Sequence, residues 1–202
     1  MMSLWQGEKQ LYAGDCGYSL AYILINEIIY QTIVDNYVGY AIHAAAIRYG
    51  EGGMLIPGKS GCGKSTLITW LVSRGANYLT DELVIISSND HCIYPFTRPI
   101  TLKSGSSAIL SSFLSVDWEK VLTGKSGFML PHRLVNKNYS IAHPPLSHIL
   151  FVEYKADESA NITRLTGAEG CLRLMACYVN ENHGISKIAA LVRNTPIFQL
   201  SG

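Results

Sequence analysis

The chain has 202 residues and a formal net charge of +1 at pH 7, and 48% of its residues are hydrophobic. This composition fits one compact domain with a full hydrophobic core. Because no run of lysine or arginine is present, we expect no DNA or RNA partner. The five cysteines are odd in number and show no metal-ligand spacing, which favours reduced thiols in a cytoplasmic protein.

The first long apolar stretch covers residues 19–34 and is rich in Ile, Leu, Tyr and Ala. Asn26, Glu27 and Gln31 interrupt it, and it is shorter than the ~20 apolar residues that a membrane-spanning helix needs. Neither a basic region nor a cleavage site marks a signal peptide. We therefore expect no membrane anchor, and we predict that residues 1–39 form a helical segment packed on the rest of the domain.

An antiparallel hairpin is predicted next along the chain. Residues 40–49 and 54–56 have the composition of strands, and the glycine-rich segment between them is typical of a turn. If the turn is centred near Glu51, His43 lies opposite residue 58 or 59, where a phosphate-binding motif begins. A lone histidine on a strand is usually a packing residue, but this placement makes a catalytic or phosphate-contacting role an equal alternative.

The segment Gly58–Ser65 reads GKSGCGKS, and its spacing of glycine, four residues and Gly-Lys-Ser is that of a phosphate-binding loop. Glycines allow successive backbone N–H groups to point at the phosphates of a nucleotide. Lys64 is expected to reach the β- and γ-phosphates, and the Ser65 hydroxyl to bind Mg²⁺. The expected nucleotide-binding residues are Gly58, Lys59, Ser60, Gly61, Cys62, Gly63, Lys64, Ser65 and Thr66.

The elements predicted around this loop are the ones that the motif requires. A short apolar strand, residues 53–57, leads in, and a helix over residues 65–74 leads out. That helix directs its positive N-terminal end at the phosphates, and Gly75 follows it where a left-handed C-terminal cap is expected. The apolar residues at helical spacing are Leu67, Ile68, Leu71 and Val72.

A strand over residues 77–82 is predicted to end in two adjacent carboxylates, Asp81 and Glu82. Neighbouring residues on an extended strand point to opposite faces, so one carboxylate can address Mg²⁺ while the other addresses a substrate or stays solvated. Phosphoryl transfer needs both a metal ligand and an acceptor for the proton of the attacking hydroxyl. A plain polar strand end is the alternative.

The second half of the chain has weaker patterns. Residues 104–145 have little periodicity and are interpreted as a substrate-binding lid. Beyond them we predict a strand over 146–154, a helix over 167–179 and a closing strand over 196–200. In this division, 40–103 is the nucleotide-binding core and 104–202 the lid, substrate region and closing elements of one domain. The residues of the helix expected to face inward are Leu172, Met175, Ala176 and Val179.

Residues 42–103 resemble the C-terminal catalytic domain of the HPr kinase/phosphorylase family and its shorter HPr kinase-like relatives. The segments that carry the resemblance are IHAAAIRYGEGG, GKSGCGKST, RGANYLTDELVII and YPFTRPITLK. The resemblance implies an α/β P-loop domain of the HPr kinase and phosphoenolpyruvate carboxykinase type. Such a domain has a mixed sheet and an antiparallel hairpin that leads into the P-loop.

The resemblance also implies roles for single residues. Lys64 would contact the nucleotide phosphates, and His43 would lie near the transferred phosphate. Asp81 and Glu82 match the paired aspartates of the family, and because a misplacement of ~1 Å can change a rate ~100-fold, the longer Glu82 leaves open which of them is the base. Arg98 is the expected cation of the matching stretch, with a plain surface arginine as the alternative. The expected catalytic residues are His43, Lys64, Asp81, Glu82 and Arg98, and the expected metal ligands are Ser65 and Asp81.

The sequence also departs from the bifunctional members of that family. Only about 40 residues precede His43, so the separate N-terminal domain of those enzymes is missing. The glycine-rich signature and the arginine-bearing loop that handle the protein substrate and phosphorolysis have no convincing counterpart. Phosphorylase activity and HPr itself as the substrate are therefore left open.

The sequence as a whole predicts a kinase that depends on ATP and Mg²⁺ and moves the γ-phosphoryl group to a hydroxyl. The expected acceptor is a serine of a protein or of a small precursor peptide, and a homo-oligomer is possible by resemblance alone. One alternative is a nucleotide-binding accessory or switch module without phosphoryl transfer. A small-molecule kinase is the other.

Overall fold

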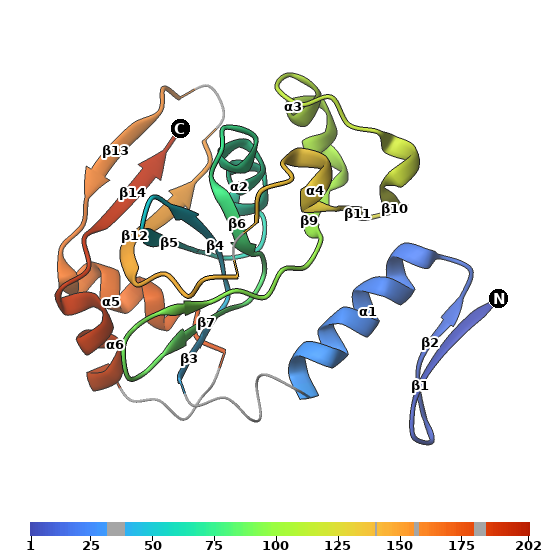
Figure 1. The fold of residues 1–202 in the computed structure, drawn as a ribbon, viewed down its shortest axis with the longest axis horizontal. Helices are drawn as coiled ribbons and strands as arrows, with labels where there is room; N and C mark the ends of the chain where they lie inside the picture. Colours follow the sequence, from blue (N-terminus) through green and yellow to red (C-terminus); the bar gives the residue numbers. More distant parts are fainter. Residues whose placement is uncertain (32–38, 140, 156–157, 180–184) are drawn as a thin grey trace.

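The computed structural model describes residues 1–31, 39–139, 141–155, 158–179 and 185–202. Its centre is a six-stranded sheet (Figure 1). In sheet order the strands are β13 (Asn161–Arg164), β14 (Ile197–Ser201), β12 (Leu146–Glu153), β5 (Gly52–Pro57), β4 (Ala44–Tyr49) and β6 (Asn77–Thr80). The β12 strand runs parallel to β14 and β5, whereas the other neighbours are antiparallel. The fold is therefore mixed α/β with a mixed sheet, as the sequence predicts.

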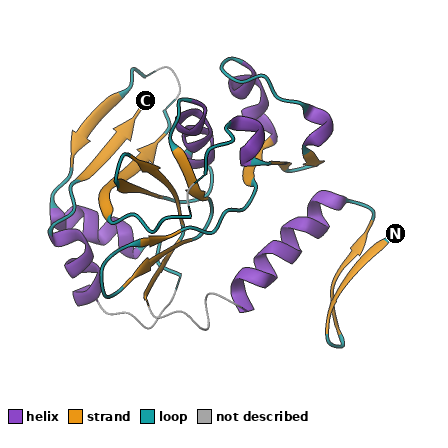
Figure 2. Ribbon diagram, in the orientation of Figure 1, coloured by secondary structure: helices purple, strands orange, loops and turns teal. Residues whose placement is uncertain are grey.

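Helices cover both faces of this sheet, as Figure 2 shows. The helices are α2 (Lys64–Ser73) on one face and α5 (Gly167–Met175) with α6 (Ile185–Arg193) on the other. Successive side chains of a strand point to opposite faces, and β4 follows this rule. Ala44 and Ala46 join the core beneath α5 and α6, whereas Ala45 and Ile47 join the core beneath α2. The strand is buried on both faces, which explains its apolar composition.

Two smaller sheets and an N-terminal unit complete the chain. One sheet contains β3 (Gly39–Ile42), β7 (Val84–Ser87) and β8 (Ile93–Tyr94), and the other contains β9 (Ile100–Lys103), β11 (Gly127–Leu130) and β10 (Leu122–Gly124). The N-terminal unit is the hairpin of β1 (Met2–Gln6) and β2 (Lys9–Gly14), followed by α1 (Gly17–Ile29). Short helices α3 (Ser107–Ser111) and α4 (His132–Val135) lie near β9. Within the described part of the chain, no helix has the length and apolar character needed to cross a membrane.

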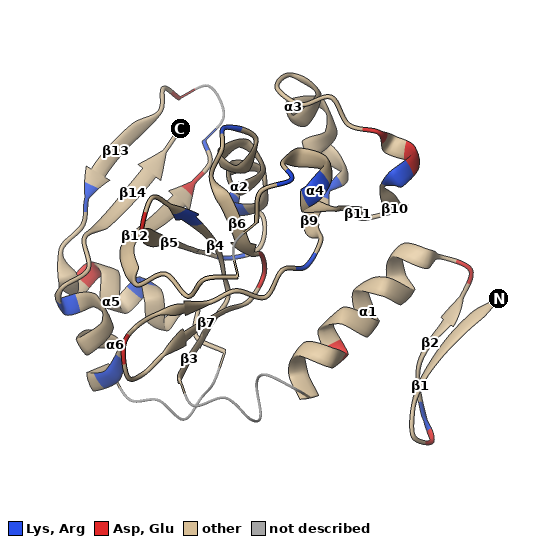
Figure 3. Ribbon diagram, viewed as in Figure 1, with Lys and Arg blue, Asp and Glu red and all other residues tan. Residues whose placement is uncertain are grey.

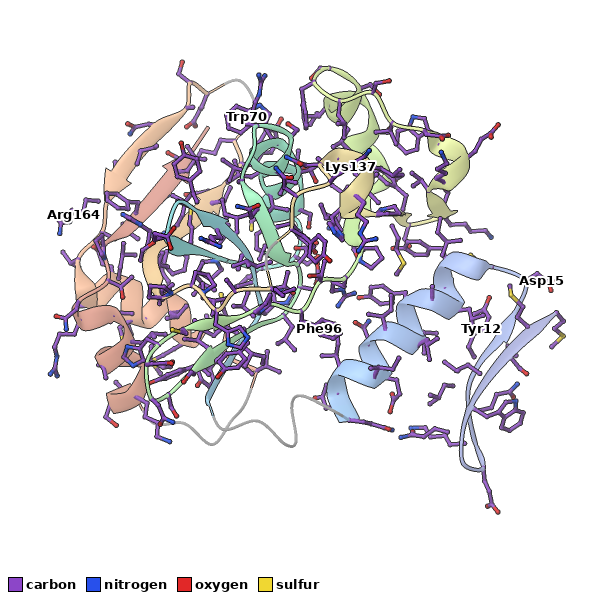
Figure 4. All side chains as sticks on the ribbon, viewed as in Figure 1. Tyr12, Asp15, Trp70, Phe96, Lys137 and Arg164 are labelled. Carbon is purple, nitrogen blue, oxygen red and sulfur yellow. The ribbon has the colours of Figure 1, made fainter. Side chains whose placement is uncertain are left out.

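The N-terminal unit differs in part from the helical segment expected over 1–39. The helix α1 is present, but a hairpin that was not predicted precedes it, and residues 32–38 lie outside the described ranges. Ile25 and Ile29 of α1 pack with Ala41, Ile85 and Phe96, of which Phe96 is labelled in Figure 4. This apolar contact holds α1 against the body of the domain.

The strand expected over 40–49 is divided at His43. Residues before it form β3 and residues after it form β4, and the two strands belong to different sheets. The register of the following hairpin pairs Ala44 with Pro57, so His43 does lie opposite the start of the phosphate loop, as predicted. A sequence pattern cannot reveal this division because both strands are equally apolar.

Part of the segment 104–145, which is expected to form a substrate-binding lid, contributes side chains to the core. Leu110, Phe128 and Leu130 are buried in the same core as Ile68 and Val72 of α2. A segment that contributes fully buried side chains to the core cannot open without exposing them to water. These residues are therefore part of the packed core, and a substrate-binding lid within 104–145 stays a prediction.

The inward face predicted for the helix at 167–179 is partly wrong. Leu172 is 70% exposed and Ala176 is exposed, whereas Cys171, Leu174 and Cys177 are buried. Free cysteine behaves as a small hydrophobic residue, and counting these two cysteines as apolar would have selected the correct face. The helix α6 was not predicted at all, and its residues Ile188 and Leu191 complete the core beside Leu174.

Gly75 forms the left-handed C-terminal cap of α2, as predicted. The Gly75 N–H donates to the carbonyl of Val72 and the Ala76 N–H donates to that of Leu71, both at 3.1 Å. These two bonds and the Gly75 φ of +104° form a Schellman motif, which satisfies carbonyl groups that the helix leaves unpaired. The motif fixes the point at which the chain turns from α2 into β6.

Replacing Gly75 with alanine is expected to lower the free energy of unfolding by about 1 kcal/mol, because a Cβ atom disfavours positive φ. A Cβ built there meets no atom within 4 Å, so backbone strain is the whole effect. The matched control is Gly167→Ala at the first residue of α5, which also has open space but no positive φ. Urea unfolding measures both, and equal changes would contradict this account.

Candidate active site

The loop GKSGCGKS connects β5 to α2, and its glycines have positive φ. Gly61 and Gly63 have φ of +89° and +102°, which side chains with a Cβ rarely adopt. Lys64 is 4% exposed, and its Nζ donates to the carbonyls of Gly58 at 2.7 Å and Lys59 at 3.1 Å. The lysine thus lies folded over its own loop, with its charge held at the N-terminus of α2.

Asp81 is bound to the first turn of the same helix. The Ser65 Oγ donates to Asp81 Oδ2 at 3.1 Å, and the Thr101 N–H donates to the same oxygen at 3.3 Å. Asp81 is fully buried, and its other oxygen, Oδ1, has no hydrogen-bond partner among the described residues. Burial, and next the charge of Glu82, raise the pKa of Asp81 to about 6. A buried carboxylate with free lone pairs is compensated when a cation binds it.

Ser65 and Asp81 therefore fit a Mg²⁺ ion. Hydroxyl and carboxylate oxygens are its preferred ligands, and Mg²⁺ usually completes its shell with water and substrate phosphates. Among the residues that the structure describes, no group of three or more His, Cys, Asp and Glu side chains could hold a metal. An ion at this place would take Ser65 and Asp81 as protein ligands and fill its other positions with water or phosphate oxygens.

Glu82 does not continue the strand, contrary to the expectation for residues 77–82. The β6 strand ends at Thr80, and Glu82 has a φ of +73°, which is unusual for a residue other than glycine. Asp81 contacts Ser65 and Glu82 contacts His43, so the two carboxylates have different neighbours, as expected. The cause is the turn at Glu82 and not the alternation of an extended strand. Such a conformation costs about 1–3 kcal/mol and is often found at functional sites.

His43 lies beside Glu82, at the break between β3 and β4. Its Nδ1 is 3.8 Å from Glu82 Oε2, and both side chains are half-buried. Burial, followed by the charge of Lys64, lowers the pKa of His43, and Glu82 only partly opposes this change. The neutral imidazole is therefore favoured at pH 7, so the pair is a possible proton-handling couple rather than a fixed ion pair.

Arg98 is placed differently from the other expected site residues. It is buried, and its Nη1 donates to Asn26 Oδ1 of α1 at 3.3 Å. It does not line the cavity at the phosphate loop, and its charge acts on Asp81, whose pKa it lowers slightly against the effect of burial. Arg98 therefore ties α1 to the core behind the carboxylates, and the structure gives no contact with the loop.

A cavity of about 490 Å³ opens in front of the loop. Its floor contains Lys64, Ser65 and Glu82, and α1 forms the opposite wall with Tyr18 and Tyr22. The sequence predicts α1 only as a helix packed on the domain, and its place at the cavity is a feature that the sequence does not reveal. The remaining lining residues described are Ser19, Ile23, Ser60, Gly61, Gly63, Thr66, Thr101, Leu102, Lys103, Ser106 and Ser126.

Lys103 is the site residue that the sequence analysis missed. It ends β9 and lines the cavity, and a Cβ built on Gly61 would lie 2.9 Å from its Nζ. Lys103 thus supplies a second cation beside the loop, whereas Arg98 was the cation expected from this stretch of the sequence. Lys103 ends the same segment, YPFTRPITLK, that contains Arg98, so the sequence offered both cations and did not distinguish them.

Comparisons with known proteins find distant structural similarity. No family model and no curated protein matches the chain. Among the solved structures, one match is the Hpr(Ser) kinase/phosphatase from Coxiella burnetii, with 11% sequence identity and a TM-score of 0.38. The match covers 80% of this chain and 84% of that chain. It suggests a distant relationship of fold at most and carries no argument about activity, so membership of the HPr kinase family stays a prediction.

Proposed function

We propose that the protein is an ATP- and Mg²⁺-dependent kinase that transfers the γ-phosphoryl group to a hydroxyl, with a serine of a protein or small peptide as the acceptor. The observation that carries the proposal is that Lys64, Ser65 and Glu82 line one cavity, and that Ser65 contacts Asp81 while Glu82 contacts His43. Lys64 and the Ser65–Asp81 pair lie at the phosphate loop, and Glu82 lies at the cavity floor beside His43. Phosphoryl transfer requires groups that hold the phosphates, groups that stabilise their charge and a group that accepts the hydroxyl proton, and these side chains could serve those roles.

In the proposed reaction the acceptor hydroxyl oxygen bonds to the γ-phosphorus as the bond to the β,γ-bridging oxygen breaks, and ADP leaves. Lys64 exchanges its bonds to the loop carbonyls for bonds to phosphate oxygens. Ser65 and Asp81 would hold Mg²⁺, which neutralises phosphate charge when bound. The hydroxyl proton passes to a carboxylate of the acid pair.

Glu82 is the better candidate for that proton acceptor. Asp81 is fully buried and its Oδ2 is engaged by Ser65, whereas Glu82 lines the cavity and is half-buried. A general base must come within hydrogen-bond reach of the hydroxyl that it deprotonates. We therefore propose that Asp81 is a ligand of Mg²⁺ and that Glu82 accepts the hydroxyl proton. His43, which lies beside Glu82, can share that proton.

The wall opposite the carboxylates favours a polypeptide acceptor. The helix α1 presents the stacked rings of Tyr18 and Tyr22 there, together with Ile23. Figure 3 shows that α1 carries few charges, and in sequence its one charged residue is Glu27. A phosphorylated or acidic metabolite would need cations on this side, whereas an apolar and aromatic wall suits a peptide side chain.

The test is transfer from γ-³²P-labelled ATP to the polypeptides encoded next to this gene, followed by mass analysis for phosphoserine. Glu82→Gln is expected to lower kcat by roughly 100-fold or more while ATP affinity is retained, because general-base catalysis contributes about that much. A metabolite extract is the second acceptor pool. Label in a metabolite alone would favour the small-molecule kinase, and repeated absence of any product despite ATP binding would contradict a kinase and leave the accessory module.

A further inference from the structure

A second cavity, of about 540 Å³, adjoins the first at the phosphate loop. Both cavities are lined by the same five residues at their junction, so they are two arms of one hollow. The shared residues are Gly61, Gly63, Thr66, Lys103 and Ser106. A ligand that places its phosphates at the loop can extend into either arm.

The second arm differs from the first in chemistry. Its walls are mostly apolar and aromatic, and they come from α2, from α3 with the residues that flank it, and from the ends of β12 and β14. Trp70, Ile109 and Tyr154 line it although they are 41%, 47% and 64% exposed, so core packing does not account for them. Concave apolar sites with a few polar groups are typical of small-molecule binding. The other apolar side chains that line it are Leu67, Phe113, Val152 and Leu200.

The helix α2 runs from the phosphate loop along this arm. Thr66 and Trp70 are four residues apart, so they lie on one face of the helix, one turn from each other. Trp70, labelled in Figure 4, carries the guanidinium of Arg74 over its ring at 5.6 Å, which helps to hold the indole in place. An aromatic ring is thus presented about one helical turn away from the loop.

We infer that the second cavity binds the nucleobase and ribose of the nucleotide, with the base against Trp70, and that the first cavity is left to the acceptor. The inference rests on the proposed function, because it takes the phosphates to lie at the loop. Base stacking on aromatic side chains is favourable for every base, since each has a π face. Ser106 and Glu153 are polar side chains in this arm that could bond to the ribose or the base.

The positions of the carboxylates support this division. Glu82 lines only the first cavity, so an acceptor hydroxyl in the second would be out of its reach. The acidic side chain of the second cavity, Glu153, already accepts a hydrogen bond from Gln199 at 2.6 Å. The apolar arm is therefore suited to binding and the polar arm to transfer.

The experiment compares the binding of ATP with that of inorganic tripolyphosphate, both with Mg²⁺, by calorimetry. Trp70→Ala and, separately, Tyr154→Ala are expected to weaken ATP binding, by about tenfold for Trp70, and to leave tripolyphosphate binding unchanged. Both side chains are well exposed, so their truncation should be tolerated. Trp5→Ala, at an exposed tryptophan of β1, is the matched control and should change neither ligand.

Each result bears on a different claim. If wild-type protein binds ATP no more tightly than tripolyphosphate, or if neither variant lowers ATP affinity, the nucleoside does not occupy this cavity and the inference is overturned. An equal loss for both ligands would overturn it too, because the loss would then lie in the loop. If wild-type protein binds neither ligand, it is the phosphate site, and with it the proposed function, that fails.

Discussion

Lys64→Ala is expected to lower the rate of phosphoryl transfer by about 1,000-fold at saturating ATP, because removal of one preorganised charge donor costs about 100- to 1,000-fold in kcat. Its Nζ lies buried on the loop carbonyls of Gly58 and Lys59, ready to move to a phosphate oxygen. In the variant those two carbonyls remain available to water, so we expect the fold to persist. Initial rates of phosphoserine formation, with thermal unfolding of the same samples, measure both effects.

The matched control for this prediction is Lys9→Ala on β2, an exposed lysine outside both cavities. It removes the same charge and should leave the rate unchanged, which separates the local effect from that of net charge. A Lys64→Ala variant that remains folded and transfers phosphate at more than a tenth of the wild-type rate would contradict the assignment. Lys103 would then be the cation to examine, since it also reaches the loop.

The parts of the fold that were predicted correctly depend on local chemistry. The loop motif fixes a strand before it and a helix after it, and these are β5 and α2. Gly75 ends α2 because a single residue without Cβ adopts the required φ. The hairpin register follows from the turn length, so the pairing of Ala44 with Pro57 was accessible from the sequence.

The features that were missed depend on contacts between distant segments. Nothing near His43 reveals that the chain changes sheets there, because that change depends on the pairing of β3 with β7. The conformation of Glu82 is set by its surroundings, since a glutamate alone avoids positive φ. Lys103 and Arg98 belong to one extended stretch, and only the tertiary packing decides which of them reaches the loop. Spacing therefore predicts a type of site but not every residue that lies at it.

Asp81→Asn is expected to make the protein more stable at neutral pH while it lowers the rate of transfer. The pKa of Asp81 rises from its ordinary value of 3.8 to about 6 in the fold, chiefly through burial. Below about pH 3 the carboxyl is protonated in both states and has no effect on stability. Between pH 4 and 6 the unfolded chain loses its proton first, so stability falls as the pH rises. Above pH 6 the loss is constant, at about 2–3 kcal/mol.

The asparagine amide keeps an oxygen for the Ser65 hydroxyl or the Thr101 N–H, so the variant removes the charge with little loss of hydrogen bonding. Its free energy of unfolding should exceed that of the wild type by about 2–3 kcal/mol at pH 7.5, and the difference should shrink as the pH falls and vanish below about pH 3. Urea unfolding at several pH values measures this difference. Asp117→Asn at an exposed, Lys120-paired carboxylate is the control and should give no gain.

Mg²⁺ with a non-hydrolysable ATP analogue extends the same test to the metal. A cation beside Asp81 favours its charged form, so it should recover the stability that the buried charge costs in the wild type and should do less for Asp81→Asn. Transfer by the variant should fall by about 100-fold or more, since a metal ligand is lost. Parallel stability curves for the two proteins across pH 4–7.5 would show that Asp81 is not held at a raised pKa. An equal gain from Mg²⁺ in both proteins would place the ion elsewhere than on Asp81.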